Sequence, residues 1–402
     1  MTPALAPRRR HGDRCGAAPI PSEIALRSTR RSFCGWVLAL VACVGADGPG
    51  KGPPPVSPPG GAEAAVELEP PIIAAAAAEP DAEVWLRGST HVHARPSGDS
   101  QMPIPDVIRW YEAHGYDWIA LTDHNRISEV EGSTAGQPAV RAPAQGLIVL
   151  AGIELTYNPA RCVPRGHESG KCRIHVNLIG PPARPPGKIP FGLGQGLPDE
   201  RIAKYQAALT LHRSLGGLAQ LNHPQWYWGM TGDLLAELGR RGMRLVEISN
   251  VQFDRWNRGD AAHPSTEALW DEALAAGVTL WGVASDDAHH YDGHGKWPAG
   301  GGWIAVKARR EPQAILDALA VGRFYASTGV VLERAEVSAG ELVVEIGAAE
   351  RRPHTIEFIE NGARVATVKE RVARRALPRA GYVRAVVTRD DGKQAWVQPA
   401  RP

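Results

Sequence analysis

Histidine and acidic residues recur directly after short apolar runs along this 402-residue chain. The first such group contains His91 and His93, two residues apart. Because alternate residues of a strand point to one face, both imidazoles can reach the same ion. Imidazole and carboxylate are ligands that divalent metals such as zinc, manganese and iron take in proteins. Further residues of this kind follow or lie within later apolar runs: Asp99, Asp123, His124, Glu154, His175, His223, Asp286, Asp287 and His289.

Apolar runs alternate with amphipathic segments from Glu83 to Ala320. This alternation predicts a parallel α/β sheet, and seven strands with helices between them favour a closed barrel over an open sheet. The chain contains neither GxGxxG nor GxxxxGK[ST], which argues against dinucleotide and P-loop sites. The predicted strands are Val84–Gly88, Trp118–Leu121, Leu147–Ile153, Ile174–Ile179, Leu218–Leu221, Leu245–Ile248 and Thr279–Val283, and the predicted helices are Ile104–His114, Arg201–Leu215, Asp233–Arg240, Ser265–Ala275 and Pro312–Ala320.

Each candidate ligand has a simpler structural interpretation when it is taken alone. Asp123 could cap a helix, and His223 could be a turn residue before Pro224. Glu154 ends a very apolar run, where a carboxylate is costly unless it is paired or metal-bound. In a barrel of parallel strands, however, functional residues gather at the carboxyl ends of the strands. Because the candidates share that position, the sequence predicts one metal centre.

The pattern changes after Gly329 to short strand-like runs separated by turn signals such as Asn361-Gly362. This arrangement predicts an all-β module, a small sandwich. The predicted strands of this module are Leu342–Ile346, His354–Ile359, Ala363–Val368, Tyr382–Val387 and Gln394–Val397.

The amino-terminal region has the features of an export signal. Residues 29–33 (Thr-Arg-Arg-Ser-Phe) match a twin-arginine signal, and the apolar run that follows is too short to span a bilayer. Residues 40–43 (Leu-Val-Ala-Cys) resemble a bacterial lipobox with Cys43 as the lipidated residue, and cleavage after Ala46 is the alternative. We therefore expect an exported protein of the bacterial periplasm or cell envelope, which contacts a membrane only through a lipid anchor.

Four segments follow from these patterns. Residues 1–46 form the export signal, and residues 47–80, rich in Pro, Gly and Ala, form a flexible linker. Residues 81–330 form the metal-binding barrel, and residues 331–402 form the β module. The net charge of +2 predicts no nucleic-acid partner. Cys162 and Cys172 could close a disulfide in an oxidising compartment, and two free thiols in a surface loop are the alternative.

The order of the motifs resembles the polymerase and histidinol phosphatase (PHP) superfamily. These motifs are His-x-His at 91–93, Ser-Gly-Asp at 97–99, Thr-Asp-His at 122–124, Glu154, His175, Asn-His-Pro at 222–224 and Ser-Asp-Asp-Ala-His at 285–289. Residues 322–329 (Gly-Arg-Phe-Tyr-Ala-Ser-Thr-Gly) are similar to the branch that contains carbaryl-hydrolase-type enzymes. The resemblance implies a distorted, TIM-like (β/α)7 barrel that binds two or three divalent ions (Zn, Mn or Fe), followed by a β-sandwich.

The resemblance also implies a role for each site residue. His91 and His93 would bind one ion, with Glu154 bridging to a second. Asp99 and His124 would join the second ion, His175 and His223 would hold a third, and Asp286 and His289 would complete the site. Between the two adjacent aspartates, position at the strand end favours Asp286, whereas the spacing to His289 favours Asp287. Asp123 would orient a ligand imidazole through a hydrogen bond.

The resemblance implies hydrolysis of a small-molecule ester by a hydroxide that bridges the metals. No Ser or Cys nucleophile is then needed, and the chain contains no GxSxG motif. His289 or His223 could protonate the leaving group, and Arg126 could pair with a substrate phosphate or be a solvated loop residue. Phosphate esters are the expected substrates, and carboxylic esters or carbamates are the second candidate. A cell-surface binding protein with structural metals is the third.

Aromatic residues follow His223 directly. Trp226, Tyr227 and Trp228 are expected either to line the pocket or to pack in the core. Residues 289–297 are expected to form a loop over the site. The sequence specifies neither the substrate nor the oligomeric state.

Overall fold

A computed structural model describes residues 82–402 except 169, 193 and 294–297. The predicted export signal, lipobox and linker lie outside the described residues, as does part of the predicted loop 289–297. Within the described part of the chain, no helix is both long and apolar enough to cross a membrane.

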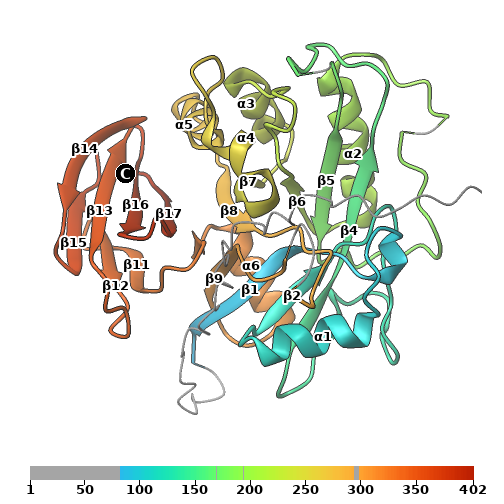
Figure 1. Ribbon diagram of the computed structural model, residues 1–402, viewed down its shortest axis with the longest axis horizontal. Helices are drawn as coiled ribbons and strands as arrows, with labels where there is room; N and C mark the ends of the chain where they lie inside the picture. Colours follow the sequence, from blue (N-terminus) through green and yellow to red (C-terminus); the bar gives the residue numbers. More distant parts are fainter. Residues whose placement is uncertain (1–81, 169, 193, 294–297) are drawn as a thin grey trace, which may run out of the picture. The chain divides into compact units, whose positions relative to one another are not determined.

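The described chain is a mixed α/β protein with one large mixed sheet and a second, three-stranded antiparallel sheet (Figure 1). All seven strands predicted before residue 300 are present, with boundaries shifted by a few residues. They lie side by side in sequence order as β1 (Val84–Val92), β2 (Trp118–Leu121), β4 (Ile148–Tyr157), β5 (Ile174–Ile179), β6 (Leu218–Leu221), β7 (Leu245–Asn250) and β8 (Trp281–Ser285), and the short β3 (Ala139–Arg141) pairs with β4.

The five predicted helices are also present, and polar caps mark where two of them begin. The Thr231 hydroxyl accepts a hydrogen bond from the Leu234 amide, and the Ser265 hydroxyl accepts one from the Ala268 amide. The helices are α1 (Ile104–Ala113), α2 (Arg201–Leu215), α3 (Gly232–Arg240), α5 (Thr266–Ala275) and α6 (Pro312–Ala320), to which the structure adds the short α4 (Asp254–Arg258) and two 3-10 turns, Arg95–Ser97 and Val251–Phe253.

The prediction of an all-parallel sheet is wrong at β5. This strand runs antiparallel to both β4 and β6, whereas the pairs β1–β2, β2–β4, β6–β7 and β7–β8 are parallel. The physical reason is the connection from β4, residues 158–173, which contains no helix to carry the chain back across the sheet. The reversal places His175, near the start of β5, opposite Thr156 near the end of β4.

A closed barrel is not shown by the pairing of these strands. Two strands that sequence patterns did not predict continue the sheet beyond β1: β9 (Trp303–Ala308) pairs antiparallel with β1, and β10 (Phe324–Ser327) pairs antiparallel with β9. On the other side, β8 ends the order of paired strands. A single parallel bridge, between Val92 and Ala288, connects the carboxyl ends of β1 and β8.

The carboxyl-terminal segment is all-β, as predicted, and its strands divide between the two sheets. Two of these strands, β11 and β15, were not predicted. β11 (Leu332–Ser338), β12 (Glu341–Ile346) and β15 (Val372–Ala376) form the small sheet. β13 (His354–Glu360), β14 (Ala363–Val368), β16 (Val383–Arg389) and β17 (Gln394–Ala400) extend the large sheet, because β17 pairs with β10.

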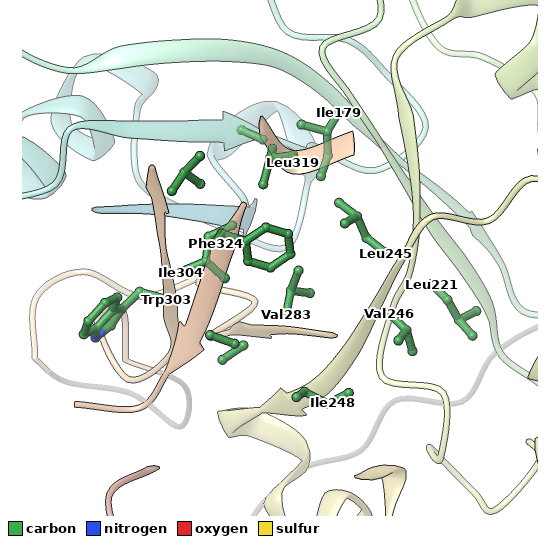
Figure 2. Close-up of a cluster of buried hydrophobic side chains, with 14 of the residues drawn as sticks. Ile179, Leu221, Leu245, Val246, Ile248, Val283, Trp303, Ile304, Leu319 and Phe324 are labelled. Atoms are coloured by element: carbon green, nitrogen blue, oxygen red, sulfur yellow. The ribbon is translucent and has the colours of Figure 1, made fainter. Parts of the chain in front are cut away.

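Buried aliphatic and aromatic side chains from β7 to β10 pack together between the sheet and its helices. Figure 2 shows Val283 of β8 beside Phe324 of β10, with Leu319 of α6 near by. All three are almost fully buried. Burial of one such side chain stabilises the fold by about 1.5–3 kcal/mol, so this core fixes the strands whose ends carry the candidate ligands.

Polar contacts tie the last strands to β8 and α5. Arg384 of β16 is buried and donates to both carboxylate oxygens of Asp271 in α5, at 2.7 and 2.6 Å, and to Glu267 at 3.1 Å. The Gln398 side-chain amide of β17 binds both the amide and the carbonyl of Gly282 in β8, at 2.9 and 2.7 Å. The carboxyl-terminal strands thereby support the strand that leads into Asp286 and Asp287.

We predict that Arg384→Met destabilises the protein by about 3 kcal/mol or more, because it leaves the Asp271 carboxylate without its cation. Arg241→Met is the matched control, since Arg241 forms an exposed i,i+4 pair with Glu237 and its loss leaves no charge buried. Urea unfolding monitored by circular dichroism measures both variants. Equal losses of stability in the two variants would contradict a structural role for the buried pair.

Candidate metal centre

The Glu154 carboxylate lies at the centre of the predicted site. It is at the end of β4 and is buried, and five histidines surround it. Oε1 is 2.9 Å from His175 Nδ1, and Oε2 is 2.6 Å from His124 Nδ1. The Nε2 atoms of His91, His93 and His223 lie 3.5 to 3.7 Å from its oxygens. A carboxylate in this position can contact more than one bound ion.

A first group of possible ligands combines the His-x-His pair of β1 with a residue after β8. The Nε2 atoms of His91 and His93 both lie 3.1 Å from Oδ1 of Asp287. Ligand atoms bound to one Zn²⁺ at about 2.0–2.1 Å are about 3.0–3.4 Å apart, so these two distances suit a shared ion. The three residues are buried.

Two further groups adjoin the first. Asp99 Oδ2 lies 2.9 Å from His124 Nε2 and 3.3 Å from His289 Nε2, and His93 completes this group. Glu154, His175 and His223 form the third group. The histidines predicted as ligands therefore all belong to one of three neighbouring groups, and His93 belongs to two.

Three buried atoms in these groups have no hydrogen-bond partner: Nε2 of His91, Nε2 of His93 and Oε2 of Glu154. Buried polar groups are normally hydrogen-bonded, and an orphaned one costs free energy. A cation among them would satisfy all three at once. The residues present therefore fit a divalent metal, and the buried His, Asp and Glu groups could hold one.

Of the two adjacent aspartates, only Asp287 lies among the grouped ligands. The Asp286 carboxylate instead faces the Ser89 hydroxyl and accepts a hydrogen bond from the Gly300 amide. Burial raises the pKa of Asp286 to about 7, which favours its neutral form. Asp287 has a φ of 48°, a left-handed conformation that is strained for a residue with a Cβ. Because of this turn, the Asp287 carboxylate reaches the histidines and the Asp286 carboxylate does not.

The structure places Asp123 differently from its predicted role. Its carboxylate accepts hydrogen bonds from the Ala94 amide, at 2.8 Å, and from the Ser128 hydroxyl, not from an imidazole. It therefore fixes the backbone directly after His93. Arg126 is half-buried beside Asp123, and within the described residues its guanidinium has no hydrogen-bond or ion-pair partner. Its predicted pairing with a phosphate stays a prediction.

Glu247 of β7 fills the orienting role, and sequence patterns missed it. Its Oε1 lies 2.7 Å from His91 Nδ1, and its Oε2 accepts the His223 amide at 2.6 Å. Ser285 donates to the same carboxylate at 2.6 Å. Carboxylates that bind the second nitrogen of a ligand histidine fix its tautomer and ring orientation. The sequence feature that could have identified Glu247 is its place as an acidic residue between Val246 and Ile248, inside a strand that is fully buried.

Trp226 and Tyr227 adjoin the centre, but Trp228 does not. Trp226 meets the rings of His175 and His223 edge-on, at centroid distances of 5.7 and 5.1 Å, and it stacks on Tyr227. Trp228 is buried and stacks on His263 instead. Trp226 thus lies against two grouped histidines and Tyr227 lies behind it, and a lining of the substrate pocket by these rings stays a prediction.

Cys162 and Cys172 form a disulfide, which decides between the two alternatives left open by the sequence. The bond joins two residues that lie ten positions apart in the segment between β4 and β5. Both half-cystines are buried. The disulfide therefore anchors the segment that leads directly into Arg173 and His175.

Before a metal binds, the histidines differ in their pKa and therefore in whether they hold a proton. Burial, with the neighbouring His289 and His124, lowers the pKa of His93 to about 3. Burial also lowers the pKa of His175 to about 4. Burial alone would lower the pKa of His124, but the Glu154 and Asp99 carboxylates raise it to about 10. At neutral pH the first two imidazoles are free to bind a cation, whereas His124 must first lose a proton.

No protein-family model matches the chain, and no curated protein matches it.

We predict that Asp287→Asn lowers metal affinity at least about tenfold, because a neutral amide replaces the charged carboxylate that lies next to both His91 and His93. Asp286→Asn is the matched control and should keep nearly the parental affinity, since Asp286 faces Ser89 and Gly300. Competition with a chromophoric chelator measures both variants. A larger loss of metal affinity in Asp286→Asn than in Asp287→Asn would indicate that Asp286 is the ligand.

We also predict that metal binding at pH 7 expels a proton from His124. Affinity should therefore rise with pH towards about 10, because the competing proton is lost as pH rises through the raised pKa. Calorimetric titration in buffers of different ionisation enthalpy gives the number of protons released. His124→Asn should release about one proton fewer than the parent protein, and an unchanged number would contradict the assignment.

Proposed function

We propose that this chain is a metal-dependent hydrolase of the PHP type that acts on phosphate esters. The observation that carries the proposal is the group of buried histidines around Glu154, with three buried ligand atoms that lack a hydrogen bond. The order of these residues along the chain is the order of the motifs that resemble the PHP superfamily.

We further propose that β1, β2 and β4–β8 form the distorted seven-stranded barrel that the resemblance implies. Two contacts favour closure between β8 and β1. Val92 and Ala288 form a parallel bridge, and the His93 amide donates to the Ala288 carbonyl at 3.0 Å. These contacts join the last strand to the first at the end that carries the ligands.

Divalent ions at this centre would lower the pKa of a coordinated water and polarise the attacked ester. His91, His93 and Asp287 would hold one ion, and His175, His223 and Glu154 another. A third place would involve Asp99 and His124 together with His93, and His289, the fourth member of that group, would bind no ion. His289 is only slightly exposed and is held by the Asp287 carbonyl at 2.6 Å.

Proton transfer to the leaving group is assigned to His289 in this proposal. Burial opposes its protonation, but Asp99 and Asp287 raise the pKa of His289 above its ordinary value, which favours the protonated form. His223 has the weaker claim, because its side chain is almost fully buried behind Glu154 and Phe253. Export of the protein is also part of the proposal, and the disulfide between Cys162 and Cys172 favours an oxidising compartment.

The test compares hydrolysis of four nitrophenyl substrates by the purified chain loaded with Mn²⁺ or Zn²⁺: a phosphate monoester, a phosphodiester, an acetate and a carbamate. We expect the phosphate monoester to be preferred. His93→Ala should lower its turnover about a thousandfold or more, since it removes a ligand shared by two groups.

Preference for the acetate or carbamate would instead indicate a carboxyl-ester hydrolase on the same centre. Metal binding without turnover of any substrate would favour a binding protein. Activity that persists in His93→Ala would contradict the assigned centre.

A further inference from the structure

A pair of cations lies next to the candidate metal centre, on residues that no step above uses. The Arg173 guanidinium lies 5.0 Å from the ring centroid of Trp226 and 5.3 Å from that of Tyr227. The Lys171 ammonium lies 5.2 Å from the Tyr227 ring. Trp226 in turn contacts two of the grouped histidines, His175 and His223.

The position of Arg173 follows from the start of β5. Arg173 precedes His175 by two residues, and side chains at that spacing point to the same face of an extended chain. The side chain is half-buried, and its guanidinium donates a hydrogen bond to the Cys172 carbonyl, at 2.7 Å. The guanidinium is therefore directed to the same side as the ligand imidazole.

Charge balance distinguishes Arg173 from two neighbouring arginines, Arg255 and Arg161. Arg255, over the neighbouring Trp256, is paired with Glu168 at 3.3 Å. Arg161, on the other side of the disulfide, is paired with Asp199 at 3.3 Å. In the part of the chain that the structure describes, neither Arg173 nor Lys171 has a carboxylate within ion-pair distance.

The segment that carries the two cations is held in place on both sides. The disulfide ties Cys172 to Cys162. The backbone at Gly166 approaches Tyr227 so closely that a Cβ there would lie 2.5 Å from the Tyr227 carbonyl oxygen. Stacking on aromatic faces further orients the guanidinium, whose planar fork of donors matches phosphate and carboxylate oxygens.

We propose that Arg173, assisted by Lys171, binds the negatively charged group of the substrate and so selects anionic esters over neutral ones. The proposal rests on the proposed function and deepens it, because it assigns the residue that separates phosphate monoesters from carboxylic esters and carbamates. A guanidinium without a counter-ion gains most from a dianionic phosphate and little from a neutral carbonyl.

The test is equilibrium binding of phenylphosphonate, a non-hydrolysable anion, and of benzamide, a neutral probe with the same ring, to the metal-loaded full chain. Arg173→Met should weaken phenylphosphonate binding at least about tenfold, as expected for a lost charged hydrogen bond, and should leave benzamide binding unchanged. Arg161→Met, the matched control across the disulfide, should change neither. Metal content of each variant is measured in parallel.

Equal weakening of both probes in Arg173→Met would overturn the proposal, since that result indicates a packing role for Arg173. Unchanged phenylphosphonate binding would overturn it as well. If the methionine variant does not fold, Arg173→Lys replaces it, and we expect a several-fold loss for phenylphosphonate alone. Selective binding without turnover of any ester would refute the proposed hydrolysis but support the anion site, so the two failures are distinguishable.

Discussion

The contact between the Glu154 carboxylate and the histidines around it is the interaction on which the site depends. A buried carboxylate is stable only when nearby positive charge or donors compensate for its lost hydration. Here Asn222 donates to Oε1 at 3.0 Å, and His124 and His175 face the two oxygens. His91 and His93 each present an Nε2 atom without a hydrogen bond. A metal-free centre of this kind carries a cost that a bound cation removes.

The strand order explains how distant residues reach this one carboxylate. Parallel strands bring His91, Glu154 and Asp287 to one edge of the sheet. Glu247 of β7 orients the His91 ring through its contact with Nδ1. The reversed direction of β5 matters as much. Because β5 runs against its neighbours, a residue at its start, His175, lies where the other strands end.

Most strands and helices could be predicted from the sequence, because their apolar periods are clear and caps such as Ser265 mark the helix starts. The direction of β5 could not, since it depends on the path of the connection from β4, which no apolar period in the sequence reveals. The choice of Asp287 over Asp286 depends on a left-handed backbone angle, and the pairing of β17 with β10 depends on contacts far apart in the chain. Glu247 was overlooked because one acidic residue in an apolar strand has no spacing signature.

The most direct test of the account is anomalous diffraction from crystals grown with Mn²⁺ or Zn²⁺, recorded on both sides of the metal absorption edge. The account predicts peaks within about 2.0–2.4 Å of ligand atoms of His91, His93 and Asp287 and of Glu154, His175 and His223. Crystals without a peak at these residues, at metal concentrations well above the measured dissociation constant, would contradict it.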